Sequence, residues 1–105
     1  MIFITGPLYS GKRTFANALS GTRIAEVQNL AKDADDLEKL ADKLAAYDIV
    51  IATEVGGGVV PVDAGERAAR EAAGRLACLL ASRAQCVVQM FCGIPTILKG
   101  ELPPC

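Results

Sequence analysis

The chain has 105 residues, which is the size of a single domain spanning residues 1–105. Its formal charge of −1 and its pI near 5.3 exclude the basic surface on which nucleic-acid binding depends. No apolar run reaches the roughly 18 residues of a membrane span, and no secretory signal pattern is present. The sequence therefore predicts a cytoplasmic protein without a nucleic-acid or membrane partner.

Apolar residues make up 51% of the chain, and the mean hydropathy of +0.32 is high for so small a domain. Alanine accounts for part of this value, and apolar surface buried between subunits would account for the rest. We therefore expect a homo-oligomer.

The four cysteines, Cys78, Cys86, Cys92 and Cys105, show no C-x-x-C spacing, and the chain has no histidine. This pattern does not favour a zinc site. We expect buried or C-terminal thiols in a reducing compartment.

A glycine-rich loop follows the first apolar run, Ile2–Ile4. Gly6 and Gly11 bracket four residues and Lys12 comes next, which is the G-x-x-x-x-G-K pattern of a phosphate-binding loop. Inward-pointing backbone N–H groups, the positive end of a following helix and the lysine ammonium would together hold a polyphosphate. The alternative is a strand-to-helix turn without a ligand. The predicted nucleotide-binding residues are Gly6, Pro7, Leu8, Tyr9, Ser10, Gly11, Lys12, Arg13 and Thr14.

The residue after the lysine departs from the usual motif. A Ser or Thr hydroxyl normally stands there and ligates Mg²⁺, whereas this chain has Arg13. Thr14 points about 100° further round the helix and is a poor substitute. We expect ATP or GTP as the ligand, with Mg²⁺ lacking its usual hydroxyl, so binding is favoured over turnover.

Helices and strands alternate along the first half of the chain. Phe15, Ala16 and Leu19 should face a sheet from a helix over residues 11–19 that Ser20-Gly21 closes. Residues 23–30 read as an extended segment. A helix over 33–47 should begin at Asp33 as N-cap and bury the face formed by Leu37, Leu40, Ala41 and Leu44.

The second half reads as strand, helix and strand. Residues 48–54 are nearly continuous aliphatic, as in a parallel strand, and 85–92 form a second such run. Between them, residues 64–84 form a long helix with a capping box at Asp63 and Glu66, i,i+4 ion pairs, and Gly74 allowing a close neighbour. Residues 96–98 suit a short edge piece. The predicted ion pairs are Glu66/Arg70 and Glu71/Arg75.

This alternation predicts an α/β fold with a mostly parallel sheet. Ligands of such sheets bind beyond the carboxyl ends of the strands, so the Gly6–Lys12 loop and Glu54 should share one edge. Glu54 could accept a proton from a substrate hydroxyl or hold a Mg²⁺-bound water. From its position alone, a merely solvated carboxylate is equally compatible.

The segment from Thr53 to Pro61 resembles the T-N-E-V-G-x-G-I-V-P segment of the bifunctional adenosylcobinamide kinase/adenosylcobinamide-phosphate guanylyltransferases of cobalamin biosynthesis. The similarity continues through the long helix, at Arg67 and Gly74-Arg75-Leu76, and into Gly93-Ile94-Pro95. The opening loop is similar to that family's I-x-V-T-G-G-x-R-S-G-K-S.

The resemblance implies a RecA-like, three-layer P-loop domain that assembles as a trimer. It also implies phosphorylation of the aminopropanol hydroxyl of a corrinoid by ATP or GTP, with Lys12 and Glu54 as catalytic residues, followed by guanylyl transfer. The guanylyl intermediate of the family forms on a histidine, which this chain lacks. The family's middle region is also replaced by a shorter bridge over residues 21–47, so the chain resembles a shortened member.

The family's loop has Gly, Arg and Ser where this chain has Pro7, Tyr9 and Arg13, and it has Asn at the position of Thr53. Three functions are therefore weighed. The first is a reduced kinase acting on a cobinamide-like alcohol. The second is a non-catalytic nucleotide-binding or oligomer-forming relative, and the third is a scaffold without ligand.

Overall fold

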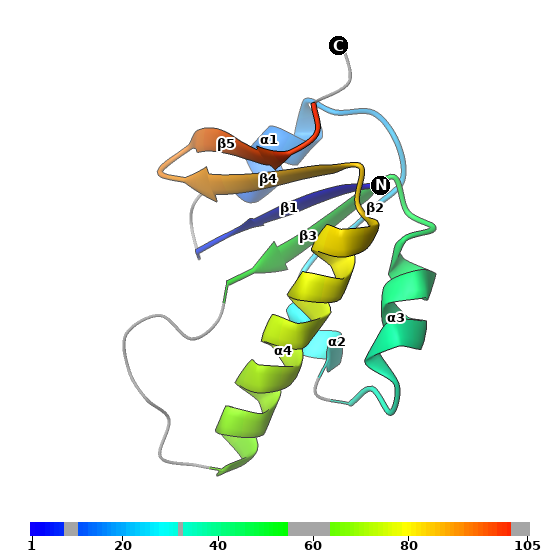
Figure 1. Ribbon diagram of the computed structural model, residues 1–105. Helices are drawn as coiled ribbons and strands as arrows, with labels where there is room; N and C mark the ends of the chain where they lie inside the picture. Colours follow the sequence, from blue (N-terminus) through cyan, green and yellow to red (C-terminus); the bar gives the residue numbers. More distant parts are fainter. Residues whose placement is uncertain (8–10, 32, 55–63, 102–105) are drawn as a thin grey trace.

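The computed structural model describes residues 1–7, 11–31, 33–54 and 64–101, except the side chains of residues 64 and 66. Strands and helices alternate through most of the chain, which confirms the α/β class (Figure 1). The elements are β1 (Ile2–Gly6), α1 (Lys12–Asn17), β2 (Arg23–Ile24), α2 (Gln28–Ala31), α3 (Leu37–Leu44), β3 (Ile49–Thr53), α4 (Ala64–Arg83), β4 (Cys86–Phe91) and β5 (Ile94–Lys99). Among these, no helix is long and apolar enough to cross a membrane.

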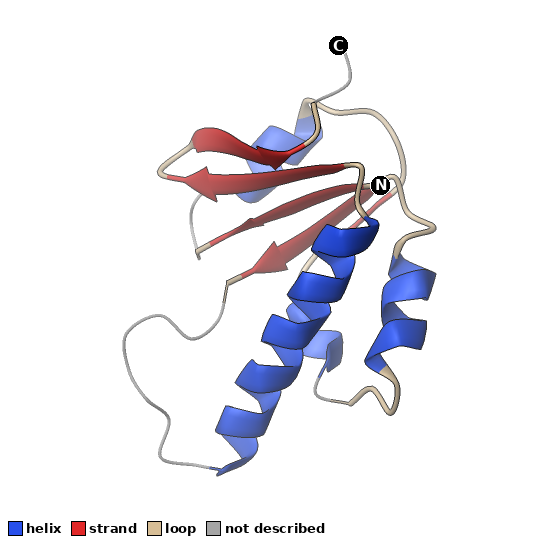
Figure 2. Ribbon diagram, in the orientation of Figure 1, coloured by secondary structure: helices blue, strands red, loops and turns tan. Residues whose placement is uncertain are grey.

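The strands form one sheet in the order β2-β3-β1-β4-β5 (Figure 2). The first four strands are parallel, and only β5 runs antiparallel, as the hairpin partner of β4. The register pairs Gly6 with Thr53 and Thr5 with Gln89, so the carboxyl ends of β1, β3 and β4 lie at one edge. The prediction of a mostly parallel sheet is therefore correct.

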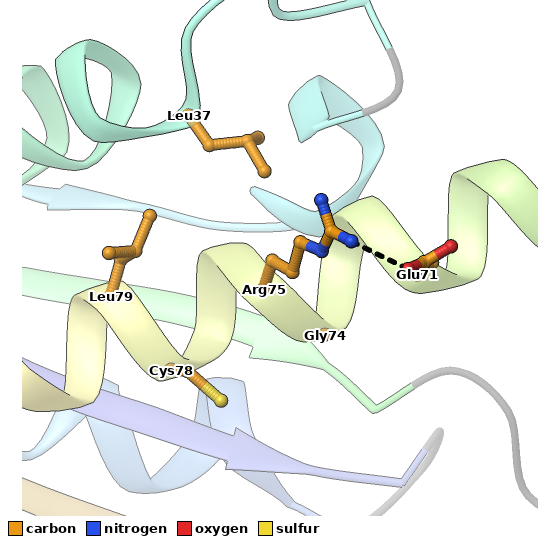
Figure 3. A pocket seen from close by; sticks show the side chains of 6 residues that line it. All are labelled: Leu37, Glu71, Gly74, Arg75, Cys78 and Leu79. Carbon is orange, nitrogen blue, oxygen red and sulfur yellow. Dashed lines mark hydrogen bonds and ion pairs between the residues drawn. The ribbon is translucent and has the colours of Figure 1, made fainter.

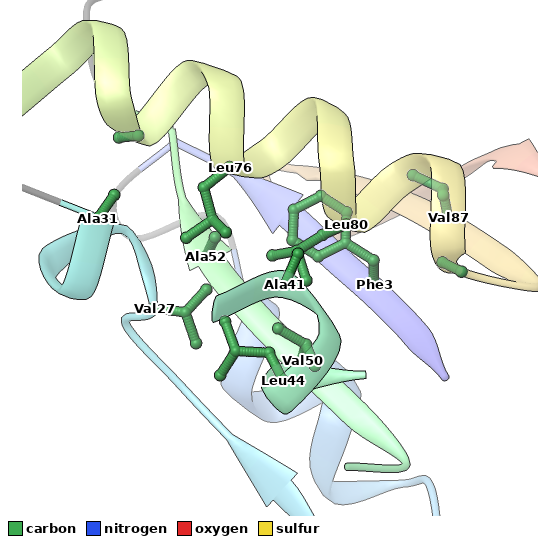
Figure 4. Close-up of a cluster of buried hydrophobic side chains, with 12 residues drawn as sticks. Phe3, Val27, Ala31, Ala41, Leu44, Val50, Ala52, Leu76, Leu80 and Val87 are labelled. Atoms are coloured by element: carbon green, nitrogen blue, oxygen red, sulfur yellow. The ribbon is translucent and has the colours of Figure 1, made fainter. Parts of the chain in front are cut away.

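One face of the sheet is covered by α2, α3 and α4 (Figure 4). Phe3 from β1, Val50 from β3 and Val87 from β4 point to this face and meet Leu76 and Leu80 of α4. The other face receives the alternate residues of the same strands, because successive side chains of a strand point to opposite sides. Burial on both faces explains why these strands read as continuous apolar runs.

The opposite face is covered by α1 and the segment that follows it. Ala16 is buried there, while Phe15 and Leu19 are partly buried, as the helical spacing predicts. They pack against a cluster from β1, β3 and β4, and the buried members of that cluster are Ile2, Ile4, Ile49, Ile51, Cys86, Val88 and Met90.

The start that was predicted for the helix over residues 33–47, which is α3 in the structure, is wrong by one turn. Asp36, not Asp33, is the N-cap, since its carboxylate accepts hydrogen bonds from the backbone N–H groups of Glu38 at 3.0 Å and Lys39 at 3.3 Å. Asp36 has the extended backbone that an N-cap requires. The buried face of α3 is as predicted.

The predicted extended segment 23–30 is correct only at its start. The strand β2 ends at Ile24, Glu26 has a positive φ of 57°, and Gln28–Ala31 is helical. The first helix likewise ends at Asn17 rather than at residue 19.

Gly21, with φ of 126°, lies against the Asp48 side chain, which accepts a hydrogen bond from the Thr22 backbone N–H at 2.9 Å.

Further predictions concerned Gly74, the cysteines and the capping box. Gly74 is exposed, and no described residue lies within 4 Å of where a Cβ would lie, so no helix or strand of the described chain approaches it closely. Cys86 is buried as expected, but Cys78 and Cys92 are exposed, because they lie on the outer side of α4 and in the β4–β5 turn. Cys105 and the capping box lie outside the described residues.

The last strand is longer than the short edge piece that was predicted. The edge strand β5 spans six residues, all of them exposed, and no described strand pairs with its outer side. The large apolar side chains that this hairpin leaves exposed are Phe91, Ile94, Ile97 and Leu98.

Candidate functional site

The two glycines of the loop lie where β1 ends and α1 begins. Gly11 has a φ of 93°, which L-residues with a side chain rarely adopt. A Cβ on Gly11 would also lie 3.2 Å from the Gly93 Cα of the β4–β5 turn. Glycine is therefore required here both for the backbone angle and for the close approach of the turn. Leu8, Tyr9 and Ser10 lie outside the described residues.

Lys12 is the buried cation of the loop. Its side chain is only 6% exposed, and its Nζ donates a hydrogen bond to the Pro7 carbonyl oxygen at 2.6 Å. Burial lowers the pKa of Lys12, while the nearby carboxylates of Glu26 and Glu54 act in the opposite direction and Arg13 adds to the lowering. The ammonium thus lies against the Pro7 carbonyl, in a partly desolvated place near the carboxylates of Glu26 and Glu54.

Glu54 follows β3 directly and lies beside the loop, at the edge where it was predicted. Its backbone N–H donates to the Gly6 carbonyl oxygen at 2.8 Å. Its exposed carboxylate accepts a hydrogen bond from the Gln89 amide at 2.6 Å. Because Gln89 belongs to β4, the two strands that flank β1 together orient this carboxylate over the carboxyl edge of the sheet.

Glu26 is a third charged member of the site, and sequence reasoning missed it. Its carboxylate accepts hydrogen bonds from the Gln28 amide at 2.6 Å and the Thr53 hydroxyl at 3.2 Å. Gln28 in turn accepts from the Thr53 backbone N–H at 2.9 Å. The available signal was a carboxylate two residues beyond a short strand, and the expectation of an extended segment over 23–30 concealed it.

Arg13 and Thr14 leave the loop in different directions. Arg13 is largely exposed, and its guanidinium lies 3.6 Å from a Glu26 carboxylate oxygen. Thr14 lines a cavity on the side of the β4–β5 hairpin instead. Within the described part of the chain, no group of three or more acidic, cysteine or histidine side chains is placed to hold a metal. The site therefore brings the cations of Lys12 and Arg13 together with the carboxylates of Glu26 and Glu54.

A cavity of about 420 Å³ adjoins the loop. It lies between α1 and the β4–β5 hairpin, and neither Glu26 nor Glu54 is among the described residues that line it. The residues that line it are Gly11, Thr14, Phe15, Met90 and Gly93.

A larger hollow of about 690 Å³ lies on the outer side of α3 and α4 (Figure 3). Its charged side chains, Glu71 and Arg75, form an ion pair with each other at 2.7 Å, as predicted for this helix. No described residue of the loop lines it, and the rest of its described lining is apolar apart from the Cys78 thiol. We therefore place the candidate site at Lys12, where charged groups converge on one position, with the smaller cavity beside it at Gly11.

The chain was also compared with known proteins. The family model described as cobinamide kinase / cobinamide phosphate guanyltransferase matches residues 19–98. This range contains Glu26, Glu54 and Gln89, whereas the glycine-rich loop precedes it. No curated protein matches the chain. Since the model covers most of the sequence, the chain belongs to the cobinamide kinase / cobinamide phosphate guanyltransferase family.

Proposed function

We propose that this protein binds a nucleoside triphosphate, ATP or GTP, and transfers its γ-phosphoryl group to the hydroxyl of a cobinamide-like corrinoid. The observation that carries the proposal is the position of Lys12. Its buried ammonium lies in a glycine loop at the carboxyl edge of a parallel sheet, next to the carboxylates of Glu26 and Glu54. The family membership supports the same chemistry.

In the proposed reaction, Lys12 exchanges its hydrogen bond to Pro7 for the β- and γ-phosphate oxygens and stabilises the charge that develops on them. The alcohol oxygen attacks the γ-phosphorus, the bond to the β–γ bridging oxygen breaks, and its electron pair leaves with the nucleoside diphosphate. The alcohol proton passes to the carboxylate of Glu54, which Gln89 orients.

A resident Mg²⁺ does not fit the described residues. The motif position that should offer a hydroxyl carries Arg13, and its guanidinium is paired with Glu26. Two cations at this place disfavour a third. In this proposal Mg²⁺ arrives with the triphosphate as part of the substrate, and no step depends on a metal held by the protein.

The second activity of the family is not part of the proposal. Guanylyl transfer in the resembled enzymes uses a histidine, and none of the 105 residues is a histidine. We propose a cytoplasmic homo-oligomer, a trimer by resemblance, and the exposed apolar side chains of β5 are compatible with association.

The test combines binding with turnover. Free nucleotide at ten times its Kd should stabilise the protein by about 1.4 kcal/mol. In a domain of this size, that raises Tm by about 6 to 11 °C. Transfer of labelled γ-phosphate to cobinamide should then be measured at full nucleotide occupancy. An unchanged melting curve with both ATP and GTP would refute the proposal, whereas a shift without transfer would leave only nucleotide binding.

Nucleotide binding without turnover is a second candidate, because Arg13 replaces the hydroxyl and pairs with Glu26. Replacing Arg13 with serine should restore a metal-dependent step, since it removes the arginine from Glu26 and returns a Mg²⁺ ligand. We expect the gain in ATP affinity on adding Mg²⁺ to rise about ten-fold, with faster phosphoryl transfer, because metal assistance contributes several kcal/mol. The measurement is calorimetric titration of ATP with and without Mg²⁺.

The matched control for this variant is Arg23→Ser, which removes an exposed arginine bonded to Asn17 away from the carboxylates. It should behave like the parent protein. If Arg13→Ser also keeps the parent's response to Mg²⁺, then Arg13 does not limit turnover.

A further inference from the structure

Arg13 stands at the loop position where a metal-binding hydroxyl is usual. It follows Lys12 directly, and in ordinary phosphate-binding loops the hydroxyl of this residue ligates Mg²⁺. The Arg13 side chain is 70% exposed, and its guanidinium lies 3.6 Å from a carboxylate oxygen of Glu26, which is longer than a hydrogen bond. Glu26 therefore attracts the guanidinium by charge without using up its N–H donors, so these can bind a second acceptor.

Glu26 is held firmly by its neighbours. Its carboxylate accepts hydrogen bonds from the Gln28 amide at 2.6 Å and from the Thr53 hydroxyl at 3.2 Å, which join it to α2 and to the carboxyl end of β3. Its backbone φ of 57° is uncommon for a residue with a side chain, and such angles are concentrated at binding and catalytic sites. Glu26 is thus a fixed anchor for the exposed cation beside it.

The pair of Arg13 and Glu26 lies near the ammonium of Lys12. Burial is the main cause that lowers the pKa of Lys12, and the charges of the pair act on it as well, since Glu26 raises this pKa and Arg13 lowers it. Lys12 and Arg13 are also adjacent in the chain, and the arginine side chain is long and exposed. A phosphate bound by Lys12 would therefore lie within reach of the Arg13 guanidinium.

We propose that Arg13 takes over the place of a divalent cation, so that its guanidinium binds the phosphates directly and the preferred ligand is a metal-free nucleoside triphosphate. The inference rests on the proposed function, because it takes the phosphates to lie at Lys12. In ordinary loops, a hydroxyl and a carboxylate at a strand end hold Mg²⁺ against the phosphates. In this protein, Glu26 holds a guanidinium instead, whose planar fork binds phosphate through two parallel hydrogen bonds.

The charge of the ligand gives the direction of the effect on affinity. Mg²⁺ cancels part of the negative charge of a triphosphate, so it lowers the attraction of the ligand to Lys12 and Arg13. Loops that hold the metal offset this loss through their contacts with Mg²⁺. A guanidinium at the same position repels the metal. The parent protein should therefore bind ATP in excess EDTA at least as tightly as ATP with saturating Mg²⁺.

The test titrates ATP and inorganic tripolyphosphate into the full chain by calorimetry, each with excess EDTA and with saturating Mg²⁺. Replacing Arg13 with alanine should weaken both metal-free ligands by about 10- to 100-fold, because hydrogen bonds between charged groups are strong. With Mg²⁺ present, the loss should be less than about three-fold, since the metal then supplies the positive charge that the guanidinium supplied. The variant should fold, because exposed ion pairs add little stability, and a thermal melt without ligand checks this.

The matched control is Arg23→Ala, which removes the same charge from another exposed arginine. The Arg23 guanidinium donates a hydrogen bond to the Asn17 side chain at 2.7 Å. This variant should keep the parent's affinity for both ligands under both conditions. A loss confined to Arg13→Ala then reflects a contact with the ligand and not the net charge of the protein.

Three results would overturn the inference while nucleotide binding stands. In the first, Arg13→Ala leaves the metal-free affinities unchanged, so Arg13 only obstructs a metal. In the second, the parent binds ATP more than about ten-fold more tightly with Mg²⁺ than with EDTA. In the third, Arg13→Ala weakens ATP but not tripolyphosphate, so the guanidinium does not contact the phosphates. If the parent binds neither ligand under either condition, the proposed function itself fails and this inference fails with it.

Discussion

Replacing Lys12 with alanine is expected to weaken ATP and GTP binding by about 10- to 100-fold, since a hydrogen bond to a charged group contributes about 1.5 to 3 kcal/mol. Phosphoryl transfer should fall by a further factor of about 10² to 10³, because the lysine also stabilises charge in the transition state. The stabilisation by nucleotide in a thermal melt should disappear. The free variant should remain folded, since burial already disfavours this ammonium in the native state.

The matched control is Lys43→Ala, which removes an exposed lysine from α3. It should keep the nucleotide-induced shift in Tm. A pH series adds a second check, because the lowered pKa of Lys12 means that its charge is lost at a lower pH than that of an ordinary lysine. Nucleotide affinity should therefore begin to fall earlier on the alkaline side, and Lys12→Arg should remove that fall. Equal nucleotide affinity in Lys12→Ala and the parent would contradict the proposed role of the loop.

Replacing Glu54 with glutamine is expected to reduce the rate of phosphoryl transfer by about 10² to 10⁴, since the amide cannot accept the alcohol proton. Nucleotide affinity should change little, because the carboxylate is proposed to contact the acceptor alcohol and not the triphosphate. The measurement is single-turnover transfer of labelled γ-phosphate to cobinamide, with nucleotide binding followed separately. A fall in kcat with unchanged binding distinguishes this role from a structural one.

Glu71→Gln is the control for Glu54. Glu71 is also an exposed carboxylate, held by Arg75 on α4. Its replacement should leave transfer unaffected. Should Glu54→Gln transfer phosphate at the parent's rate, Glu54 would be only a solvated group at the end of a strand.

Much of the fold was accessible from the sequence, because burial on both faces leaves an unambiguous pattern. The strands β1, β3 and β4 are continuous apolar runs, and the buried face of α3 follows the helical repeat. The segment 23–36 was not accessible in the same way. Its turn at Glu26 and the helix α2 depend on hydrogen bonds to Thr53, which is 27 residues away from Glu26 in the sequence.

The residues of the candidate site likewise differ in whether the sequence predicts them. Lys12 and Glu54 could be predicted because a local motif marks the first and a strand end marks the second. Glu26 and Gln89 could not be predicted. They lie close to the rest of the site because of the strand order β2-β3-β1-β4, which places elements from three distant parts of the chain at one edge. Spacing in the sequence carries no information about that order.

The outer side of β5 bears on how the protein behaves when it is concentrated. A sheet edge with exposed apolar side chains can serve as a template on which a second chain adds a strand, which is a common route to aggregation. Pro95 offers no backbone N–H near the start of this strand, and Lys99 at its end donates hydrogen bonds to the α4 carbonyl oxygens of Ala81 and Ser82. These two residues shorten the length over which such a template can act, so they reduce the tendency of this edge to pair with a second chain.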